Sequence, residues 1–165
     1  MTVATSDIKY YLSGGGTNAD PGASLGGAIS SVQAGTDLFD NVLAAEASAG
    51  DVEYRLLYVK NTHATDTLYA AKAWVPTNTP STYSSVKIAL CDEGASATAE
   101  TVATEGTAPT GPVFAEAATV GAALSLGNLG PGAYYGIWVE RTITAGAPAY
   151  ANDTFTLRVT GDTSA

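Results

Sequence analysis

The sequence predicts an all-β protein, an antiparallel β-sandwich of the immunoglobulin-like or jelly-roll type with a glycine-rich N-terminal arm and long loops. Three observations lead to this prediction. Apolar and polar residues alternate with a period of two in several short segments, which is the pattern of half-buried strands. Gly, Pro, Asn and Asp residues separate these segments, as turns between strands require. Patterns with helical periodicity are nearly absent.

The N-terminal third contains one predicted strand, one arm and one short helix. Ile8–Leu12 (IKYYL) is rich in aromatic and β-branched residues and is predicted to be a strand. The glycines and small polar residues of 13–31 can pack little by themselves, so residues 1–31 are predicted to be an extended arm that lies on another surface. Residues 42–50 (VLAAEASAG) are rich in alanine and are predicted to form a turn or two of helix that Gly50 ends.

The middle of the chain contains three further predicted strands. Residues 52–60 (VEYRLLYVK) begin with a period-two alternation and then become apolar on both faces. Residues 68–75 and 86–91 follow, the second with Val86 and Ile88 on one face. Polar or proline-containing loops separate these strands.

The last third contains an irregular excursion and two strands. Residues 94–123 are mostly Ala, Thr, Ser, Glu and Gly, and we expect them to leave the sandwich as a long loop. Gly130-Pro131-Gly132 predicts a turn that leads into a strand over Tyr134–Ile143. Residues 154–160 alternate most clearly and predict the final strand. Since neither an internal repeat nor a linker interrupts residues 1–165, one domain is predicted.

Composition limits the classes of partner. Hydrophobic residues make up 45% of the chain and charged residues 14%, which favours a folded protein. The formal net charge of -9 predicts that the chain does not bind nucleic acid or anionic membrane surfaces. The start of the chain, MTVATS, lacks the basic residues and apolar block of a secretory signal, so folding in a cytoplasm is expected.

The sequence offers no convincing catalytic, cofactor or metal site. Ser24 lies in a G-x-S-x-G match, but no helical pattern follows it and His63 is the only histidine that could act as a base. Cys91 is the only cysteine, which excludes a thiolate cluster. Four candidate carboxylates lack the alternating spacing of a calcium loop: Asp37, Asp40, Asp92 and Glu93. The chain is therefore predicted not to be an enzyme and to carry no cofactor.

The two tryptophans leave an alternative open. Trp138 shares a strand face with Gly136 and Glu140, and Trp74 alternates in phase with Lys72, so both side chains are candidates for the outer surface. Exposed tryptophans occur at protein interfaces and at sugar-stacking platforms. The other interpretation is that both complete the core.

Three stretches, residues 8–31, 38–60 and 126–161, resemble small virion structural proteins of tailed bacteriophages. The resemblance covers most of the chain except 94–123 and contains no catalytic signature. It implies a β-sandwich subunit on the particle, with a capsid decoration (cement) protein as the first choice. The alternatives are a head-fibre base, a tail or baseplate component, and a carbohydrate-binding β-sandwich module.

A decoration protein made in a bacterial cytoplasm would bind the major capsid protein on the outer surface of the virion, where an acidic surface fits better than in the DNA-lined interior. The resemblance therefore implies a homo-oligomer, a trimer over capsid threefold positions, with residues 8–29 as the main contact segment. The predicted interface residues are Ile8, Tyr10, Tyr11, Leu12, Asn18, Asp20, Leu25, Ile29, Trp74 and Trp138.

Overall fold

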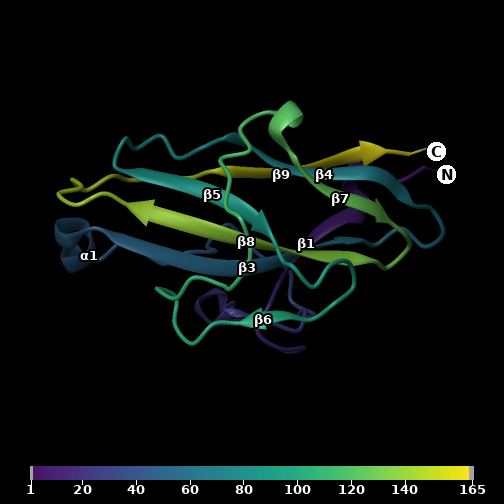
Figure 1. The fold of residues 1–165 in the computed structure, drawn as a ribbon, viewed down its shortest axis with the longest axis horizontal. Coiled ribbons are helices and arrows are strands. Elements are labelled where there is room, and N and C mark those ends of the chain that lie inside the picture. Colours follow the sequence, from purple (N-terminus) through teal and green to yellow (C-terminus); the bar gives the residue numbers. More distant parts are fainter. Residues whose placement is uncertain (1, 164–165) are drawn as a thin grey trace.

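A computed structural model describes residues 2–163 and consists almost entirely of antiparallel β-sheet (Figure 1). The larger sheet has four strands, in the order β1-β3-β8-β5. Their bounds are Ile8–Leu12 for β1, Asp51–Asn61 for β3, Tyr134–Ile143 for β8 and Ser84–Leu90 for β5. The smaller sheet has three strands in the order β7-β4-β9, with bounds Leu124–Leu129, Leu68–Thr77 and Thr156–Asp162 respectively. The predicted antiparallel sandwich is confirmed.

The main core lies between these two sheets. Leu57 and Val59 of β3 face it, together with Ile137 and Val139 of β8, and Ala73 of β4 closes it from the smaller sheet. Every one of these side chains is at most 5% exposed. Burial of apolar area on this scale is the main free-energy term that holds the two sheets together.

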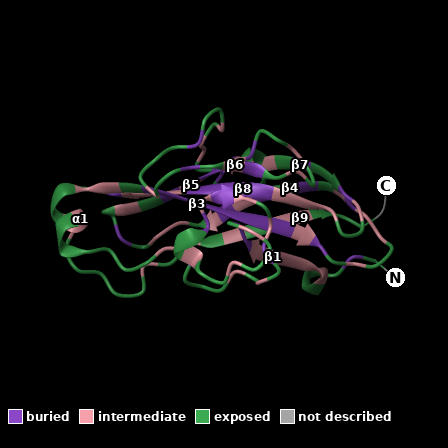
Figure 2. Ribbon diagram, turned by 90° about the horizontal axis from the view of Figure 1, so that it is seen from below, coloured by how far each residue is buried: buried purple, intermediate pink, exposed green. Residues whose placement is uncertain are grey.

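The opposite face of the four-stranded sheet is buried as well. Leu56 and Tyr58 of β3, Ala89 of β5 and Trp138 of β8 form a second apolar cluster there. This arrangement explains why residues 52–60 are apolar on both faces, since each face packs against its own core. Figure 2 shows the buried residues concentrated in the middle of the strands.

Two segments that the sequence predicted to be irregular, residues 13–31 and 94–123, pack over the second cluster. We call these two segments the cover. A short ladder of β2 (Gly26–Gly27) and β6 (Ala99–Thr101) joins residues 13–31 to the 94–123 segment. The backbone N–H of Leu56 donates to the Ser24 carbonyl oxygen at 2.8 Å, and the N–H of Tyr54 donates to the Glu105 carbonyl oxygen at 2.7 Å. Both segments thus pack on their own domain, because β3 extends beyond β1 and its backbone groups need partners there.

Two of the predicted interface residues, Trp138 and Leu12, are buried, so their predicted role in an interface is wrong. Trp138 is 0% exposed, because the side of the sheet that it faces is buried beneath the cover. Leu12, the last residue of β1, is 2% exposed, and its backbone N–H donates to the Val32 carbonyl oxygen at 3.0 Å. The segment predicted to be an arm therefore begins with a strand of the larger sheet and then folds back along it.

The Tyr58 side chain of β3 forms two hydrogen bonds with the cover. The phenolic O–H donates to the Gly27 carbonyl oxygen at 2.6 Å and accepts the N–H of Ala99 at 2.9 Å. Desolvation by burial raises the pKa of Tyr58 to about 12, so the donor proton stays in place at neutral pH. We expect Tyr58→Phe to lower the free energy of unfolding by about 1–3 kcal/mol, because it leaves a buried N–H without a partner.

The measurement for Tyr58→Phe is urea unfolding combined with amide hydrogen exchange. Exchange at Ala99 should accelerate more than exchange at Ile137, in the centre of the main core. Equal acceleration at both amides would show that the hydroxyl does not hold the cover.

The remaining elements are short helices. α1 (Ala44–Ala49) falls within the predicted helix, and Gly50 ends it with a φ of 79°. A side chain at Gly50 would also approach the Ala145 nitrogen at 3.0 Å, so the glycine is needed for the close contact as well. The 3-10 helix η1 (Thr5–Asp7) precedes β1, and η2 (Pro21–Ala23) and η3 (Val120–Ala122) lie in connections between strands.

Candidate protein-interaction surface

Strand register gathers three loops at one end of the sandwich. Asp51 of β3 pairs with Ile143 of β8, which also pairs with Ser84 of β5, so these strand ends lie side by side. The connections that leave them are residues 40–50 with α1, residues 78–83, and residues 144–155. We call these three segments the loop end. Figure 1 shows it at the opposite side of the molecule from both termini.

Exposed apolar side chains concentrate around the loop end. Among residues 2–163, five of the seven exposed large hydrophobic residues lie in it or next to it: Val42, Leu43, Val52, Tyr83 and Tyr150. Leu43 is 60% exposed and Tyr150 is 53% exposed. A cluster of exposed apolar side chains is typical of a surface that binds another protein, whereas single exposed apolar residues scattered over a surface are common in any soluble protein. Figure 2 shows the α1 end of the molecule as mostly exposed.

A groove of about 750 Å³ extends from the loop end to the start of β9, at Thr156 and Leu157. Residues 34–42 form one wall and residues 152–157 form another. The apolar part of its lining includes Tyr10, Leu38, Phe39, Ile143, Phe155 and Leu157. Burial raises the pKa of the Tyr10 phenol, and the nearby Val159 amide and Arg158 partly oppose this effect. The volume is within the range of pockets that hold small ligands or partner side chains.

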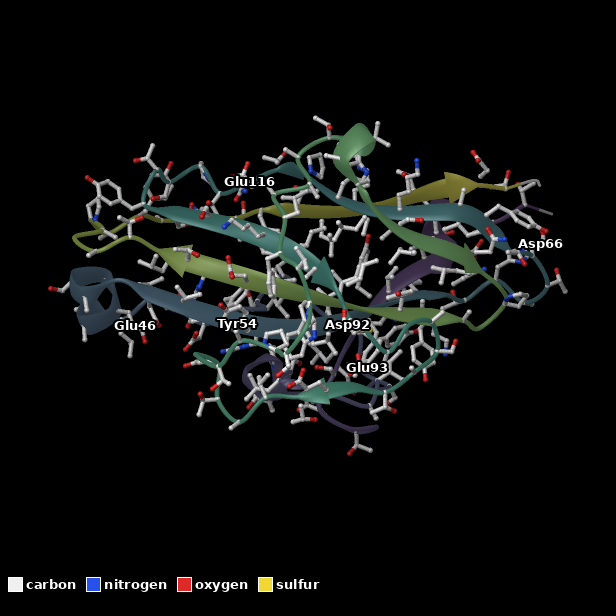
Figure 3. The ribbon with its side chains drawn as sticks, viewed as in Figure 1. Glu46, Tyr54, Asp66, Asp92, Glu93 and Glu116 are labelled. Carbon is white, nitrogen blue, oxygen red and sulfur yellow. The ribbon has the colours of Figure 1, made fainter. Side chains whose placement is uncertain are left out.

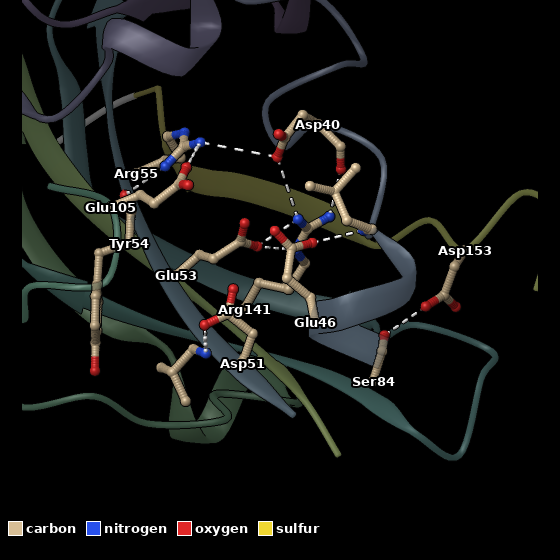
Figure 4. Close-up of polar contacts among 12 residues, drawn as sticks. Asp40, Glu46, Asp51, Glu53, Tyr54, Arg55, Ser84, Glu105, Arg141 and Asp153 are labelled. Carbon is tan, nitrogen blue, oxygen red and sulfur yellow. Dashed lines mark hydrogen bonds and ion pairs between the residues drawn. The ribbon is translucent and has the colours of Figure 1, made fainter. Parts of the chain in front are cut away.

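An ion-pair network holds one wall of the groove in place (Figure 4). Arg141 of β8 binds the Glu53 carboxylate through its Nε and one terminal nitrogen, and another terminal nitrogen donates to the Asp40 carbonyl oxygen at 2.8 Å. Arg55 of β3 binds the Glu105 carboxylate. The Phe39 ring lies against both guanidinium groups, with its centroid 4.7 Å from the Arg141 carbon and 5.6 Å from that of Arg55. These contacts fix residues 39–40 over the sheet.

The network contains three carboxylates, those of Asp40, Glu53 and Glu105, and two guanidinium groups, so its formal net charge is -1. Carboxylate oxygens of Asp40, Glu53 and Glu105 lie within 4.8 Å of one another, a spacing that could suit a metal ion. Arg55 and Arg141 already bind these carboxylates, so the arrangement is explained by ion pairs. Glu53 is 1% exposed, and desolvation by burial raises its pKa, with the Arg141 charge opposing the rise. Sequence reasoning missed the network because its members are separated by up to 101 residues.

The predicted interface residues do not form one surface. Asp20 is exposed, but its carboxylate caps η2 by accepting the Gly22 N–H at 2.9 Å. Asn18 donates to the Ser13 carbonyl oxygen at 2.6 Å, which turns it toward its own domain. Trp74 is half-buried in β4, with the Arg158 guanidinium carbon 5.5 Å from its ring centroid. Six further residues are half-buried or buried in β1 and the cover: Ile8, Tyr10, Tyr11, Leu12, Leu25 and Ile29.

The serine and histidine that the sequence singled out have structural contacts. Ser24 is 0% exposed, and its hydroxyl donates to the Ser13 carbonyl oxygen at 3.5 Å. The Nδ1 atom of His63 accepts the N–H of Asp66 at 2.9 Å and so closes a turn between β3 and β4. These contacts account for both residues as parts of local loop structure.

Fold and surface together define a class: an all-β sandwich domain with a buried cover on one sheet and an exposed apolar surface at its loop end. No protein-family model, curated protein or solved structure matches the chain. Between residues 2 and 163, none of the helices has the length and apolar character needed to cross a membrane.

Proposed function

We propose that this chain is a structural protein of a tailed-phage virion that binds the outer capsid surface and stabilises the particle. The loop end is the surface that we assign to the capsid contact, in place of the N-terminal segment. The observation that carries its protein-binding role is the gathering of exposed Leu43, Tyr83 and Tyr150 beside a groove. The resemblance of residues 8–31, 38–60 and 126–161 to virion proteins supports the assignment to a particle.

Charge supports an exterior position. The net charge of -9 would be repelled by packaged DNA and is tolerated on an outer surface. Figure 3 shows acidic side chains in several parts of the molecule, with Glu46 in α1, Asp66 at the opposite end and Glu116 near β5. A net charge well away from zero also favours solubility.

Burial of Trp138 weakens the carbohydrate-binding alternative. That alternative required Trp74 and Trp138 as stacking platforms on an outer face, and Trp138 is 0% exposed. A tail or baseplate position uses the same fold and differs from decoration in copy number. Mass-spectrometric counting on purified virions therefore tests the proposal. A copy number near that of the major capsid protein supports decoration, a few copies per particle support the tail, and absence from the particle contradicts both.

The second prediction concerns the loop end itself. We expect the double variant Leu43→Ser and Tyr150→Ser to bind purified capsids at least about tenfold more weakly than the unchanged protein, because it removes two exposed apolar anchors. Co-sedimentation of the protein with capsids that lack it measures the effect. Both side chains are exposed, so the thermal midpoint of unfolding should change little.

A matched control for this variant is Val113→Ser. Val113 is 81% exposed and lies two residues from Ala115, which pairs with the middle of β5, away from the loop end. Its capsid binding should equal that of the unchanged protein. Equal loss in both variants would show that general surface apolarity, and not the loop end, governs binding.

A further inference from the structure

The outer edge of β9 has no strand partner, although the chain covers both edges of the larger sheet. Outside β1, Tyr11 forms a bridge with Gln33, and outside β5, Ile88 forms a bridge with Ala115. Within residues 2–163, β4 is the only strand that pairs with β9, and the Tyr10 phenol near the Val159 amide is a side-chain contact. An edge without a strand partner is a template for adding another strand.

The other edge of the smaller sheet is protected in a different way. β7 carries Gly127 with a φ of 72°, and its pairing with β4 shifts register around Ala71. Such a bulge twists an edge and disfavours the addition of a strand. The pairing of β9 with β4 also shifts register twice, but each time the extra residue lies on β4, and β9 itself has no residue with positive φ over Thr156–Asp162. The structure thus leaves one regular edge available.

We propose that β9 pairs with the β9 of a second copy of this chain, antiparallel and about a twofold axis at Thr160. In this register, Arg158 of each copy lies opposite Asp162 of the other, and the two Thr160 residues face each other. Cross-strand pairs of opposite charges and of threonines both stabilise antiparallel sheets. The pairing merges two three-stranded sheets into one of six strands.

Side-chain directions agree with this register. Val159 pairs with Ala73, which is 0% exposed and faces the main core, so Arg158 and Thr160 point to the outer face of the sheet. Asp162 is two residues further along the strand and shares that face. Arg158 and Asp162 are both exposed. The two charge pairs would therefore form at the surface without burying an uncompensated charge.

The local charge permits two copies to approach here. The whole chain has a net charge of -9, but the three strands of the smaller sheet carry two cations, Lys72 and Arg158, and one anion, Asp162. Counting two positive and one negative charge, this sheet has a net charge of +1. Contact through β9 thus avoids the acidic surface that would repel a second copy elsewhere.

This contact is isologous and closes on itself, so it produces a dimer instead of the trimer that the resemblance implies. The inference is independent of the proposed virion role. A dimer in solution and failure to bind capsids would contradict only the proposed function, and capsid binding by a monomer would contradict only the β9 contact.

The test is sedimentation velocity of the full chain and of its charge variants over a range of concentrations. The unchanged protein should sediment as a dimer of 16.6 kDa chains. Arg158→Asp and Asp162→Arg each place like charges opposite one another twice, so each should raise the dimer dissociation constant by at least about tenfold. The double variant Arg158→Asp with Asp162→Arg restores opposite charges in reversed order. Its dimer dissociation constant should return to within about threefold of that of the unchanged protein.

Lys87→Asp in β5, at the opposite edge of the larger sheet from β1, is the matched control, because it changes the net charge by the same amount as Arg158→Asp. It should remain dimeric. A monomer at every concentration, a trimer, or failure of the double variant to recover would each overturn the proposal. Far-UV circular dichroism of each variant confirms that the loss of dimer does not come from unfolding.

Discussion

Trp138→Ala is expected to lower the free energy of unfolding by about 3–5 kcal/mol, the largest effect of any single apolar truncation in this chain. Trp138 heads the fully buried side chains by volume and lies at the centre of the second cluster, paired with Leu56 on one side and Ala89 on the other. Its removal leaves a cavity between the four-stranded sheet and the cover. The thermal midpoint should fall by roughly 2–4 °C for each kcal/mol lost.

The matched variant is Trp138→Phe. The indole Nε1 is buried without a hydrogen-bond partner among residues 2–163, so phenylalanine keeps much of the apolar area and removes an unsatisfied donor. We expect it to lose less than about 1.5 kcal/mol. Urea unfolding followed by far-UV circular dichroism measures both variants without relying on tryptophan fluorescence. A loss as large for Trp138→Phe as for Trp138→Ala would contradict the cavity explanation.

Arg141→Met is expected to cost about 3–5 kcal/mol at neutral pH, because it leaves the Glu53 carboxylate buried without its ion-pair partner. The Glu53 side chain is 2% exposed, whereas that of Arg141 is 12% exposed, so water cannot replace the lost contact. The segment around Asp40 also loses the hydrogen bond to its carbonyl oxygen. Denaturant unfolding at pH 7 measures the change.

The cost of Arg141→Met should depend on pH in a definite direction. Desolvation raises the pKa of Glu53 above its ordinary value of 4.5, and loss of the Arg141 charge raises it further. A carboxyl whose pKa is higher in the folded state binds its proton more tightly when folded, so its penalty is largest at high pH. The variant should therefore recover stability relative to the unchanged protein as the pH falls from 7 toward 4.5, where the unfolded chain also takes up the proton.

The compensating variant separates this explanation from simple loss of packing. Adding Glu53→Gln to Arg141→Met removes the stranded charge, so the double variant should regain at least about half of the lost free energy at pH 7. Its stability difference from the unchanged protein should also lose most of the additional pH dependence. A pH-independent cost in the single variant would show that the Glu53 charge is not the cause.

Sequence patterns located most of the strands but not the loop end that we propose as the interaction surface. Ile8–Leu12 and Tyr134–Ile143 have the predicted bounds, and the helix falls within residues 42–50. The sequence did not predict the loop end. Leu43 directly precedes a short helix, and Tyr150 lies in a loop with Gly, Pro and Asn residues, and an apolar residue in either place is a signal of exposure. The predicted N-terminal contact residues instead pack on their own domain.

The sequence by itself determined the positions of β1, β3, β4, β5, β8 and β9 and the side chains that share each of their faces, because these features follow from local periodicity and backbone preference. It did not indicate β2, β6 or β7. Only the tertiary structure decided what covers each face. Trp138 lies on the face that alternation assigned to it, yet residues far away in the chain bury that face. The strand order, the ion pairs around Phe39 and the open edge of β9 likewise depend on contacts between distant segments, which no local pattern records.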